Sequence, residues 1–228
     1  MPRKYTKEKL QSKIEEPFSN KNCNSLYRLG CINYGGKVKG EEITYQEVIA
    51  EYIYNKLIDN GLPYISLCNV RNYTKCERTD KSGEGEEKVQ REYFNGKEMP
   101  AGHDLGKCIW FELPAIRNGC GKGVDLVYFN SENGQLSIIE LKYESDESLL
   151  RPILEIQTYY QRIDWKKAID DLKKRELINY NGKISIKKYI MFDKASEYIY
   201  KKYREIENDE NSNLNKLLHA FDIGVIEY

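Results

Sequence analysis

The sequence lacks several features that each mark a class of protein. It has no Cys-x-x-Cys pair, and its only two histidines lie far apart, whereas structural zinc sites use closely spaced ligand pairs. It has no run of eighteen apolar residues, and its first twenty residues are rich in charge, so we expect neither a membrane span nor a signal peptide. It has no net charge, because 36 basic residues balance 36 acidic ones. That balance argues against a nonspecific nucleic-acid coat protein but leaves room for a local basic groove.

Length and cysteine usage bound the domain organisation. The 228 residues are enough to bury a full core, and the six cysteines, which have no paired spacing, are expected to be free thiols in a cytoplasmic protein. We expect one domain over residues 1–228, with an N-terminal extension at 1–40 and an insertion at 69–106. This segment is polar and contains glycine, which indicates an insertion or a β-hairpin with a mobile tip rather than a separate domain.

Hydrophobic periodicity and capping signals predict the order helix, three strands, helix, strand. The first helix is expected to begin at the Thr44–Glu47 capping box and to end near Asn60-Gly61. The helix after the third strand is expected to end near Arg162 or to continue to Lys174. The expected elements, in chain order, are a short helix or arm at 1–20, a helix at 44–60, strands at 107–116, 123–132 and 135–143, a helix from 145, a strand at 183–192, a charged helical stretch at 194–219 and a strand at 221–228.

The most informative segment is a pair of apolar runs on either side of Asn133-Gly134, a dipeptide typical of a tight β-hairpin turn. With these two residues as the turn, Asp125 lies opposite Lys142, and Glu140 lies diagonal to Asp125. Since strand side chains alternate between faces, all three polar residues lie on the same face. Opposed Cβ atoms are about 4.5–5.5 Å apart and diagonal ones about 7–8 Å, so two carboxylates can converge on one hard cation beside an ammonium group.

Both faces of this hairpin are largely apolar, which is typical of a sheet covered by helices on both sides. Three charges within such a sheet cost several kcal/mol unless they are paired or bound to an ion. On the face opposite to the three charges the apolar residues are Val124, Leu126, Tyr128, Ile139, Leu141 and Tyr143.

Asp125, followed some fifteen residues later by Glu140-Leu141-Lys142 at the end of a hydrophobic strand, resembles the signature of the PD-(D/E)XK nuclease superfamily. Val124 stands where many members of that superfamily have the proline of the motif. The resemblance extends over residues 41–193 in the order of elements. It implies an α/β fold with a restriction-endonuclease-like αβββαβ core, in which helices flank a mixed central sheet.

The resemblance also implies a metal-dependent nuclease that hydrolyses phosphodiester bonds, with DNA favoured over RNA as its partner. Asp125, Glu140 and the backbone carbonyl of Leu141 would bind Mg²⁺ or Mn²⁺, whose remaining ligands are waters. Lys142 would orient or deprotonate the attacking water, or neutralise the charge that develops on the phosphate.

In the superfamily a glutamate from the first core helix often completes the metal site. Glu47 and Glu51 are the candidates here, one turn apart on the predicted helix. Glu47 already belongs to the capping box, so Glu51 is preferred as the catalytic and metal-binding residue, although both can also be solvated carboxylates.

Substrate-binding candidates come from two further segments. Gln157 and Gln161 lie on the apolar stripe of the helix after the hairpin and partly match a Q-x-x-x-Y motif of some superfamily branches. Arg117 and Lys122 belong to a basic, glycine-rich loop just before Asp125. The paired lysines elsewhere are expected mainly to balance nearby acids on exposed helices.

Two alternatives remain open. The first is an inactive relative that uses the same fold to bind nucleic acid or to assemble. The second is an unrelated α/β protein in which Asp125 and Lys142 form a structural cross-strand ion pair. A homodimer is compatible with all of these, because superfamily members often dimerise to cut both strands.

Overall fold

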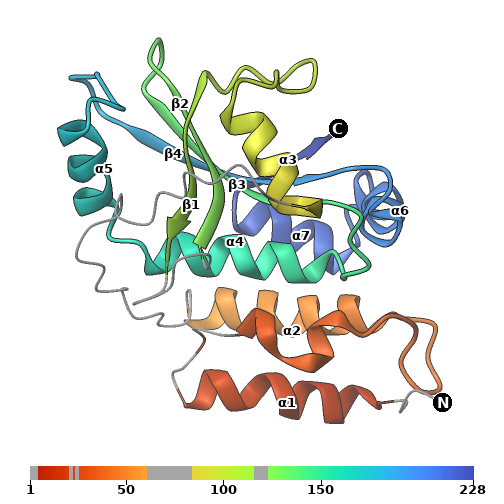
Figure 1. Cartoon of the computed structure of the whole chain (residues 1–228). Coiled ribbons are helices and arrows are strands. Elements are labelled where there is room, and N and C mark those ends of the chain that lie inside the picture. Colours follow the sequence, from red (N-terminus) through yellow and green to blue (C-terminus); the bar gives the residue numbers. More distant parts are fainter. Residues whose placement is uncertain (1–4, 21–22, 24–25, 61–83, 116–122) are drawn as a thin grey trace.

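The computed structural model describes residues 5–20, 23, 26–60, 84–115 and 123–228, and shows a five-stranded mixed sheet flanked by helices (Figure 1). The fold is therefore α/β, as predicted. The helical elements are α1 (Lys7–Ser19), η1 (Leu26–Arg28), η2 (Gly30–Asn33), α2 (Tyr45–Asn60), α3 (Gly85–Phe94), α4 (Leu150–Arg162), α5 (Trp165–Lys174), α6 (Glu197–Ile206) and α7 (Asn213–Ala220). The strands are β1 (Lys107–Pro114), β2 (Gly123–Asn130), β3 (Gln135–Lys142), β4 (Ser185–Phe192) and β5 (Ile223–Glu227).

The strands lie side by side in the order in which they occur in the chain. β2 is antiparallel to both β1 and β3, whereas β4 runs parallel to β3 and β5 runs parallel to β4. Parallel neighbours need crossover connections, and here α4 with α5 joins β3 to β4, while α6 with α7 joins β4 to β5.

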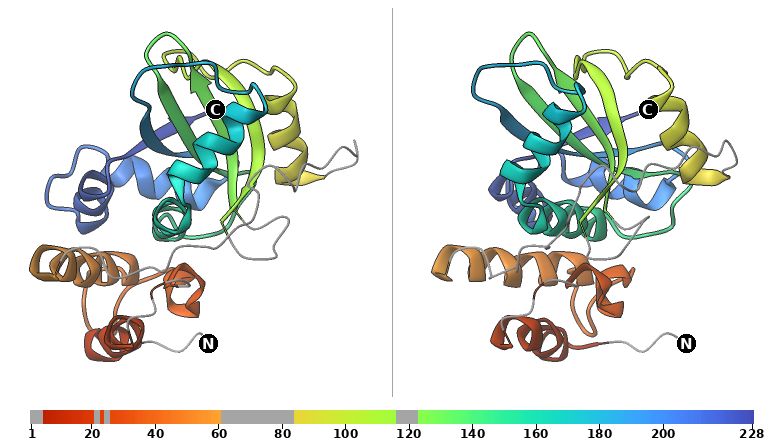
Figure 2. Two further views of the ribbon diagram at one scale, coloured as in Figure 1. Left: turned by 90° about the vertical axis from the view of Figure 1, so that its left-hand side faces the viewer. Right: turned by 60° about the vertical axis from the view of Figure 1, so that its left-hand side comes forward.

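The helices form unequal layers on the two faces of the sheet. α3 packs on one face, where Val89 and Tyr93 join Leu126, Tyr128 and other strand residues in the smaller core. α4 and α7 pack on the opposite face, and α2 and α1 lie beyond them as further layers (Figure 2). α2 contacts α7, α1 and η2, so the sheet is separated from α2 by the first helical layer. In the described part of the chain, no helix combines the length and the apolar character of a membrane span.

Local sequence explains where the crossover helices begin and end. Of the two expected ends of the helix after β3, the structure has the first: α4 ends at Arg162, and α5 is a separate helix, because Ile163 and Asp164 leave the helical conformation. The Asp164 side chain then caps α5 by accepting a hydrogen bond from the Lys167 backbone N–H at 3.1 Å. The charged stretch at 194–219 likewise contains two helices, and Ser212 caps the second of them.

The segment predicted as an insertion contains a helix that sequence analysis missed. α3 begins within the acidic run after Gly83 and ends at Phe94, and its buried face belongs to the smaller core. A β-hairpin is therefore wrong for residues 85–94. The misassignment arose because only Val89, Tyr93 and Phe94 carry apolar character in a helix otherwise rich in charge.

The hairpin between β2 and β3 has a different register from the predicted one. Asn130 pairs with Gln135, so a four-residue loop replaces the two-residue turn, and the register is displaced by two residues. The Asn130 carboxamide organises this loop, because its Oδ1 accepts hydrogen bonds from the backbone N–H groups of Glu132 and Asn133 at 2.9 and 3.3 Å. Gly134 closes the loop with a φ of 70°.

The displacement leaves the assignment of faces intact, since side-chain direction repeats every two residues. Val127, Phe129 and Ile138 belong to the larger core, and Leu126, Tyr128 and Ile139 belong to the smaller core on the other face. The expectation that both faces are apolar and covered is therefore confirmed. What changes is the pairing of residues across the two strands. The last observed pair is Leu126 with Ile139, and the next position along each strand places Asp125 opposite Glu140 rather than opposite Lys142.

We expect Gly134→Ala to destabilise the protein by about 2–3 kcal/mol, since it adds backbone strain at positive φ and a Cβ that would meet the Tyr180 ring at 2.4 Å. Gly102→Ala is the matched control, because Gly102 has a φ of 90° but no atom within 4 Å of the added Cβ. This control isolates the backbone strain, which costs about 1 kcal/mol. Urea unfolding of both variants measures the difference, and equal losses would contradict the packing of Tyr180 over the loop.

Candidate active site

Asp125 and Glu140 come together at one end of the antiparallel β2–β3 pair, where β2 begins and β3 ends. The backbone N–H of Leu141 donates a 2.7 Å hydrogen bond to Asp125 Oδ2, which fixes this carboxylate against β3. Glu140 is only 3% exposed, and its side chain points toward the helical layer that contains α4. The first two residues of the predicted site are therefore neighbours.

The ammonium group of Lys142 lies at the centre of a group of acidic side chains. Its Nζ donates a 2.7 Å hydrogen bond to Glu140 Oε1 and lies 3.6 Å from Glu155 Oε2 on α4. Glu147, in the loop before α4, reaches to 3.8 Å. Lys142 is 7% exposed, so these contacts replace most of the water that would otherwise solvate its charge.

The structure thus corrects the predicted pairing of Asp125 with Lys142. Lys142 pairs directly with Glu140 on its own strand, and Asp125 is bonded to the backbone of β3. An Asp125–Lys142 ion pair, the basis of the purely structural alternative, is not formed.

Further residues hold Glu147 and Glu155 in place. Arg151 forms an ion pair with Glu147, with 2.7 Å between Nη1 and Oε1, and its Nε lies 3.8 Å from Glu155 Oε2. The Tyr159 hydroxyl donates to Glu155 Oε1 at 3.0 Å, one helical turn along α4. Tyr27 of η1 packs edge-on against Tyr159, with 3.5 Å between the two hydroxyl oxygens, so the N-terminal segment supports this side of the site.

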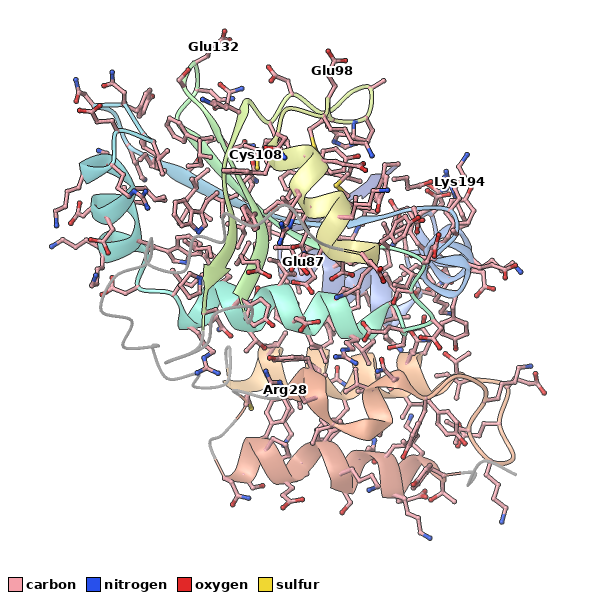
Figure 3. All side chains as sticks on the ribbon, viewed as in Figure 1. Arg28, Glu87, Glu98, Cys108, Glu132 and Lys194 are labelled. Atoms are coloured by element: carbon pink, nitrogen blue, oxygen red, sulfur yellow. The ribbon has the colours of Figure 1, made fainter. Side chains whose placement is uncertain are left out.

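A fifth carboxylate reaches the group from the other face of the sheet. Glu86, in the first turn of α3, interacts electrostatically with Asp125 and Lys142, and the nearby backbone of Tyr143 acts to lower its pKa. Its neighbour Glu87 marks this end of α3, close to the strand ends, in Figure 3. Carboxylates from β2, β3, α3 and α4 therefore surround one lysine.

The charges in this group do not balance. Asp125, Glu140, Glu147, Glu155 and Glu86 face two cations, Lys142 and Arg151. Burial, followed by repulsion from neighbouring carboxylates, holds the pKa values of Asp125 and Glu140 well above their ordinary range. Burial also raises the pKa of Glu86. For Lys142, burial acts to lower the pKa, but the surrounding carboxylates outweigh it and hold this pKa well above its ordinary value.

The donor set suits a hard divalent cation, which prefers carboxylate and carbonyl oxygens. The Oε2 atoms of Glu140, Glu147 and Glu155 are buried and have no hydrogen-bond partner within the described structure. Among residues 5–20, 23, 26–60, 84–115 and 123–228, however, no group of three or more His, Cys, Asp or Glu residues is already arranged to hold a metal ion. The chemistry of the site therefore fits a cation, and binding would have to draw the carboxylates together.

Neither glutamate of α2 belongs to this group. Glu51, the preferred third ligand, pairs with Lys7 at 2.9 Å, and the described contacts of α2 place it a layer away from the sheet. Glu47 instead binds the start of α7: it accepts hydrogen bonds from Ser212 Oγ and from the Asn213 backbone N–H at 2.8 and 2.6 Å. The capping box is half formed, since the Glu47 N–H reaches Thr44 Oγ1 at 3.4 Å.

The predicted substrate-binding residues are divided between the described and undescribed parts of the chain. Gln157 is buried and accepts a 2.7 Å hydrogen bond from Lys188 Nζ, which lies 4.6 Å above the Tyr160 ring. Burial lowers the pKa of Lys188 to about 8. Gln161 is partly exposed on α4. Arg117 and Lys122 lie outside the described residues.

The paired lysines mostly bind nearby acids, as expected from the sequence. Lys167 pairs with Asp171, Lys187 with Asp222, and Lys201 with Glu197. Lys188 is the exception, because it is buried against α4 rather than exposed. The described cysteines, Cys23, Cys31 and Cys108, are free thiols, in agreement with the prediction for them.

Sequence analysis missed Glu86, Glu147 and Glu155. Glu155 carried a usable signal, since it lies between Leu154 and Ile156 among the buried positions of α4, where an exposed face would normally place a charge. Glu86 and Glu147 carried none, because each stands in a run of acidic and polar residues that is typical of a solvated surface.

We expect Asp125→Asn to stabilise the protein at pH 7 in the absence of divalent cations. The pKa of Asp125 is raised in the folded state, so ionising this group costs folding free energy as the pH rises above its unfolded pKa of about 4. The variant should gain about 1–2 kcal/mol, or about 2–6 °C in Tm, and the gain should disappear at a pH below 4, where both states are protonated. Asp222→Asn, at an exposed ion pair, is the control and should change Tm little. A lower Tm for Asp125→Asn at pH 7 would contradict the charge imbalance.

We expect Lys142→Met to destabilise the protein by about 3 kcal/mol at neutral pH, because it leaves Glu140 and Glu155 buried without their shared cation. Adding Glu140→Gln to this variant should restore part of the loss, since it removes one of the stranded charges. Lys201→Met, at an exposed pair on α6, should change stability by less than about 0.5 kcal/mol. Denaturant unfolding checks all three, and a loss for Lys142→Met no larger than that of Lys201→Met would overturn this assignment.

Comparisons with known proteins found no relative of this chain. No protein-family model, no curated protein and no solved structure matches the chain. The case for a function therefore depends on the contacts of its own residues, and the resemblance to the PD-(D/E)XK nucleases stays a prediction.

Proposed function

We propose that this protein is a metal-dependent phosphodiesterase of nucleic acid, with DNA favoured over RNA, built on a restriction-endonuclease-like core. One observation carries the proposal: Asp125, Glu140 and Lys142 meet at the ends of β2 and β3 in a buried group where carboxylates outnumber cations. The order α3, β1, β2, β3, α4, α5, β4 agrees with the αβββαβ core that the sequence motif implies.

The proposed cofactor is Mg²⁺ or Mn²⁺. Asp125 and Glu140 would hold it, together with the Leu141 carbonyl, and Glu86 would replace Glu51 as the carboxylate from a helix. Glu86 is the better candidate because α3 packs directly on the sheet, whereas α2 does not. The bound cation would polarise the phosphodiester and lower the pKa of a bound water.

The environment of Lys142 limits the catalytic roles that this residue can have. Because the surrounding carboxylates hold its pKa well above the ordinary lysine value, Lys142 is protonated at neutral pH in the metal-free protein, which favours a role as a hydrogen-bond donor over that of a general base. Its ammonium group is held by Glu140 and Glu155, so it can donate hydrogen bonds in a fixed direction. Lys142 would therefore stabilise negative charge on the phosphate or orient the attacking water.

Glu155 and Tyr159 would act by positioning Lys142. Glu155 is 7% exposed and lies between the Lys142 ammonium and the Tyr159 hydroxyl. A carboxylate held in this way restrains the lysine without needing to touch a substrate. Arg117 and Lys122 stay proposed phosphate contacts, and Gln157 and Gln161 stay proposed substrate-binding residues.

A second candidate is an inactive nuclease-fold module that binds nucleic acid or assembles with other proteins. The direct Lys142–Glu140 ion pair favours this alternative, because a lysine already neutralised by the adjacent acid has less charge to offer a phosphate. The three carboxylate oxygens that lack a hydrogen bond and the surplus of acidic groups favour the enzyme instead, since a purely structural ion pair would require neither.

We expect Mg²⁺- or Mn²⁺-dependent cleavage of at least one member of a panel of linear, branched, single-stranded and RNA substrates. Asp125→Asn and Lys142→Met should each lower the rate at least about 100-fold, because each removes a charge that acts on the transition state. Glu86→Gln should lower it at least about tenfold and weaken the response to metal concentration, whereas Glu51→Gln should cleave like the wild type.

These variants distinguish failure of the enzyme proposal from failure of the assignment of Glu86 as the helix ligand. Equal activity of wild type and folded Lys142→Met, or no cleavage by either, would reject the enzyme. A loss for Glu51→Gln without a loss for Glu86→Gln would leave the enzyme standing but return the third ligand to α2. Thermal unfolding of each variant is the control for folding.

A further inference from the structure

A chain of polar contacts leads from the candidate active site to the surface of the N-terminal segment. Glu155 joins the Lys142 ammonium group, 3.6 Å away, to the Tyr159 hydroxyl at 3.0 Å. The hydroxyl oxygens of Tyr159 and Tyr27 are 3.5 Å apart, and the Tyr27 hydroxyl accepts a 3.0 Å hydrogen bond from Arg28 Nε. Arg28 is exposed, whereas the other four residues of the chain are buried.

The hydrogen bonds of this chain all run in one direction. The Tyr159 hydroxyl donates its proton to Glu155, so the Tyr27 hydroxyl is the donor between the two tyrosines, and its oxygen is left to accept from Arg28. With the width of the Glu155 carboxylate included, the contacts place Arg28 Nε no more than about 15 Å from Lys142 Nζ. Arg28 is therefore held at a defined distance from the site.

The partners of Arg28 orient its charge without neutralising it. The guanidinium lies over the Tyr27 ring, 5.2 Å from the centroid, and a neutral ring leaves the cation its full charge. Within the described part of the chain, its two terminal NH₂ groups make no hydrogen bond or ion pair. An exposed arginine held in this way is suited to a phosphate, which can accept two parallel hydrogen bonds from the guanidinium. Three other arginines bind glutamates instead, namely Arg91, Arg151 and Arg204.

The helix between the site and Arg28 carries further positive charge. α4 lies between the sheet and η1, to which Arg28 belongs (Figure 3). Arg151 precedes Glu155 by four residues and Arg162 follows it by seven, so the three share one stripe of α4. Both arginines of this stripe are partly exposed. A negatively charged strand that crosses α4 therefore meets arginine side chains on its way from the site to Arg28.

We propose that Arg28 binds a phosphate of the substrate strand other than the phosphate that is cleaved. This inference rests on the proposed function and restricts its substrate to nucleic-acid strands. Successive phosphates of one DNA strand rise by about 3.4 Å along the duplex axis, so a distance of about 15 Å or less places the two phosphates within about four nucleotides of each other. A small phosphodiester can reach Lys142 but not Arg28.

Fluorescence anisotropy of labelled single-stranded and duplex DNA tests the proposal, with Ca²⁺ in place of Mg²⁺ and a gel to verify that the DNA stays intact. Arg28→Gln should weaken binding about tenfold, because it removes a charged hydrogen-bond donor. It should also lower the slope of log K against log salt by about 0.7 for the single strand or 0.9 for the duplex, because one phosphate fewer is neutralised. Arg28→Lys keeps the charge and should restore the slope. Lys9→Gln removes the same charge from an exposed position of α1 and should bind as the wild type does.

Because binding is measured without cleavage, the outcomes separate this inference from the proposed enzyme. A loss of affinity and slope for Arg28→Gln but not for Lys9→Gln supports the inference, and if the wild type does not cleave, only the enzyme is rejected. Cleavage by the wild type together with unchanged binding by Arg28→Gln would overturn the inference and leave the enzyme standing. Equal losses for the two variants, or no DNA binding by the wild type, would overturn it as well.

A substrate comparison tests the restriction to strands. For a wild type that cleaves, Arg28→Gln should raise KM for DNA and leave the hydrolysis of a nitrophenyl phosphodiester unchanged, because this small diester does not extend to Arg28. An equal loss on both substrates would contradict a contact with a second phosphate. Thermal unfolding verifies that every variant is folded.

Discussion

The buried ammonium group of Lys142 is the point on which the surrounding structure depends, since a buried charge persists only when oppositely charged groups replace its water. Glu140 supplies the nearest of these groups from the same strand, and α4 supplies Glu155 from the facing layer. The loop after β3 is fixed in turn, because Asp193 and Ser196 hold the backbone of residues 144 and 145 through hydrogen bonds of 3.2 and 3.0 Å. The strand end, the loop and the helix are thus arranged around one charge.

The outer helical layers stabilise this arrangement without contributing a carboxylate to it. Ser148 Oγ donates a 2.6 Å hydrogen bond to the carbonyl of Ile32, which anchors the start of α4 to η2. Tyr27 of η1 reaches Tyr159, and Glu47 of α2 caps α7. A glutamate that serves as a helix cap is committed to backbone N–H groups, so it is not available to a cation elsewhere. Within the expected N-terminal extension, η1 and η2 therefore support α4, whereas the support for α7 comes from α2.

α3 links two chemically different regions of the protein. Its first turn brings Glu86 to the strand ends, where negative charge accumulates, and its last turn packs Tyr93 and Phe94 into the smaller core.

The sequence by itself determined the α/β class, the strands and the shared face of Asp125, Glu140 and Lys142. That shared face survived a register error of two residues, because strand side chains repeat with a period of two and the apolar residues fix which face is buried. Only the tertiary structure decided which further groups join these three. Glu86, Glu147 and Glu155 arrive from separate elements, and Glu51 lies a layer away, because the packing of helices on a sheet depends on the fit of whole surfaces. The sequence around a single glutamate does not predict how these surfaces fit together.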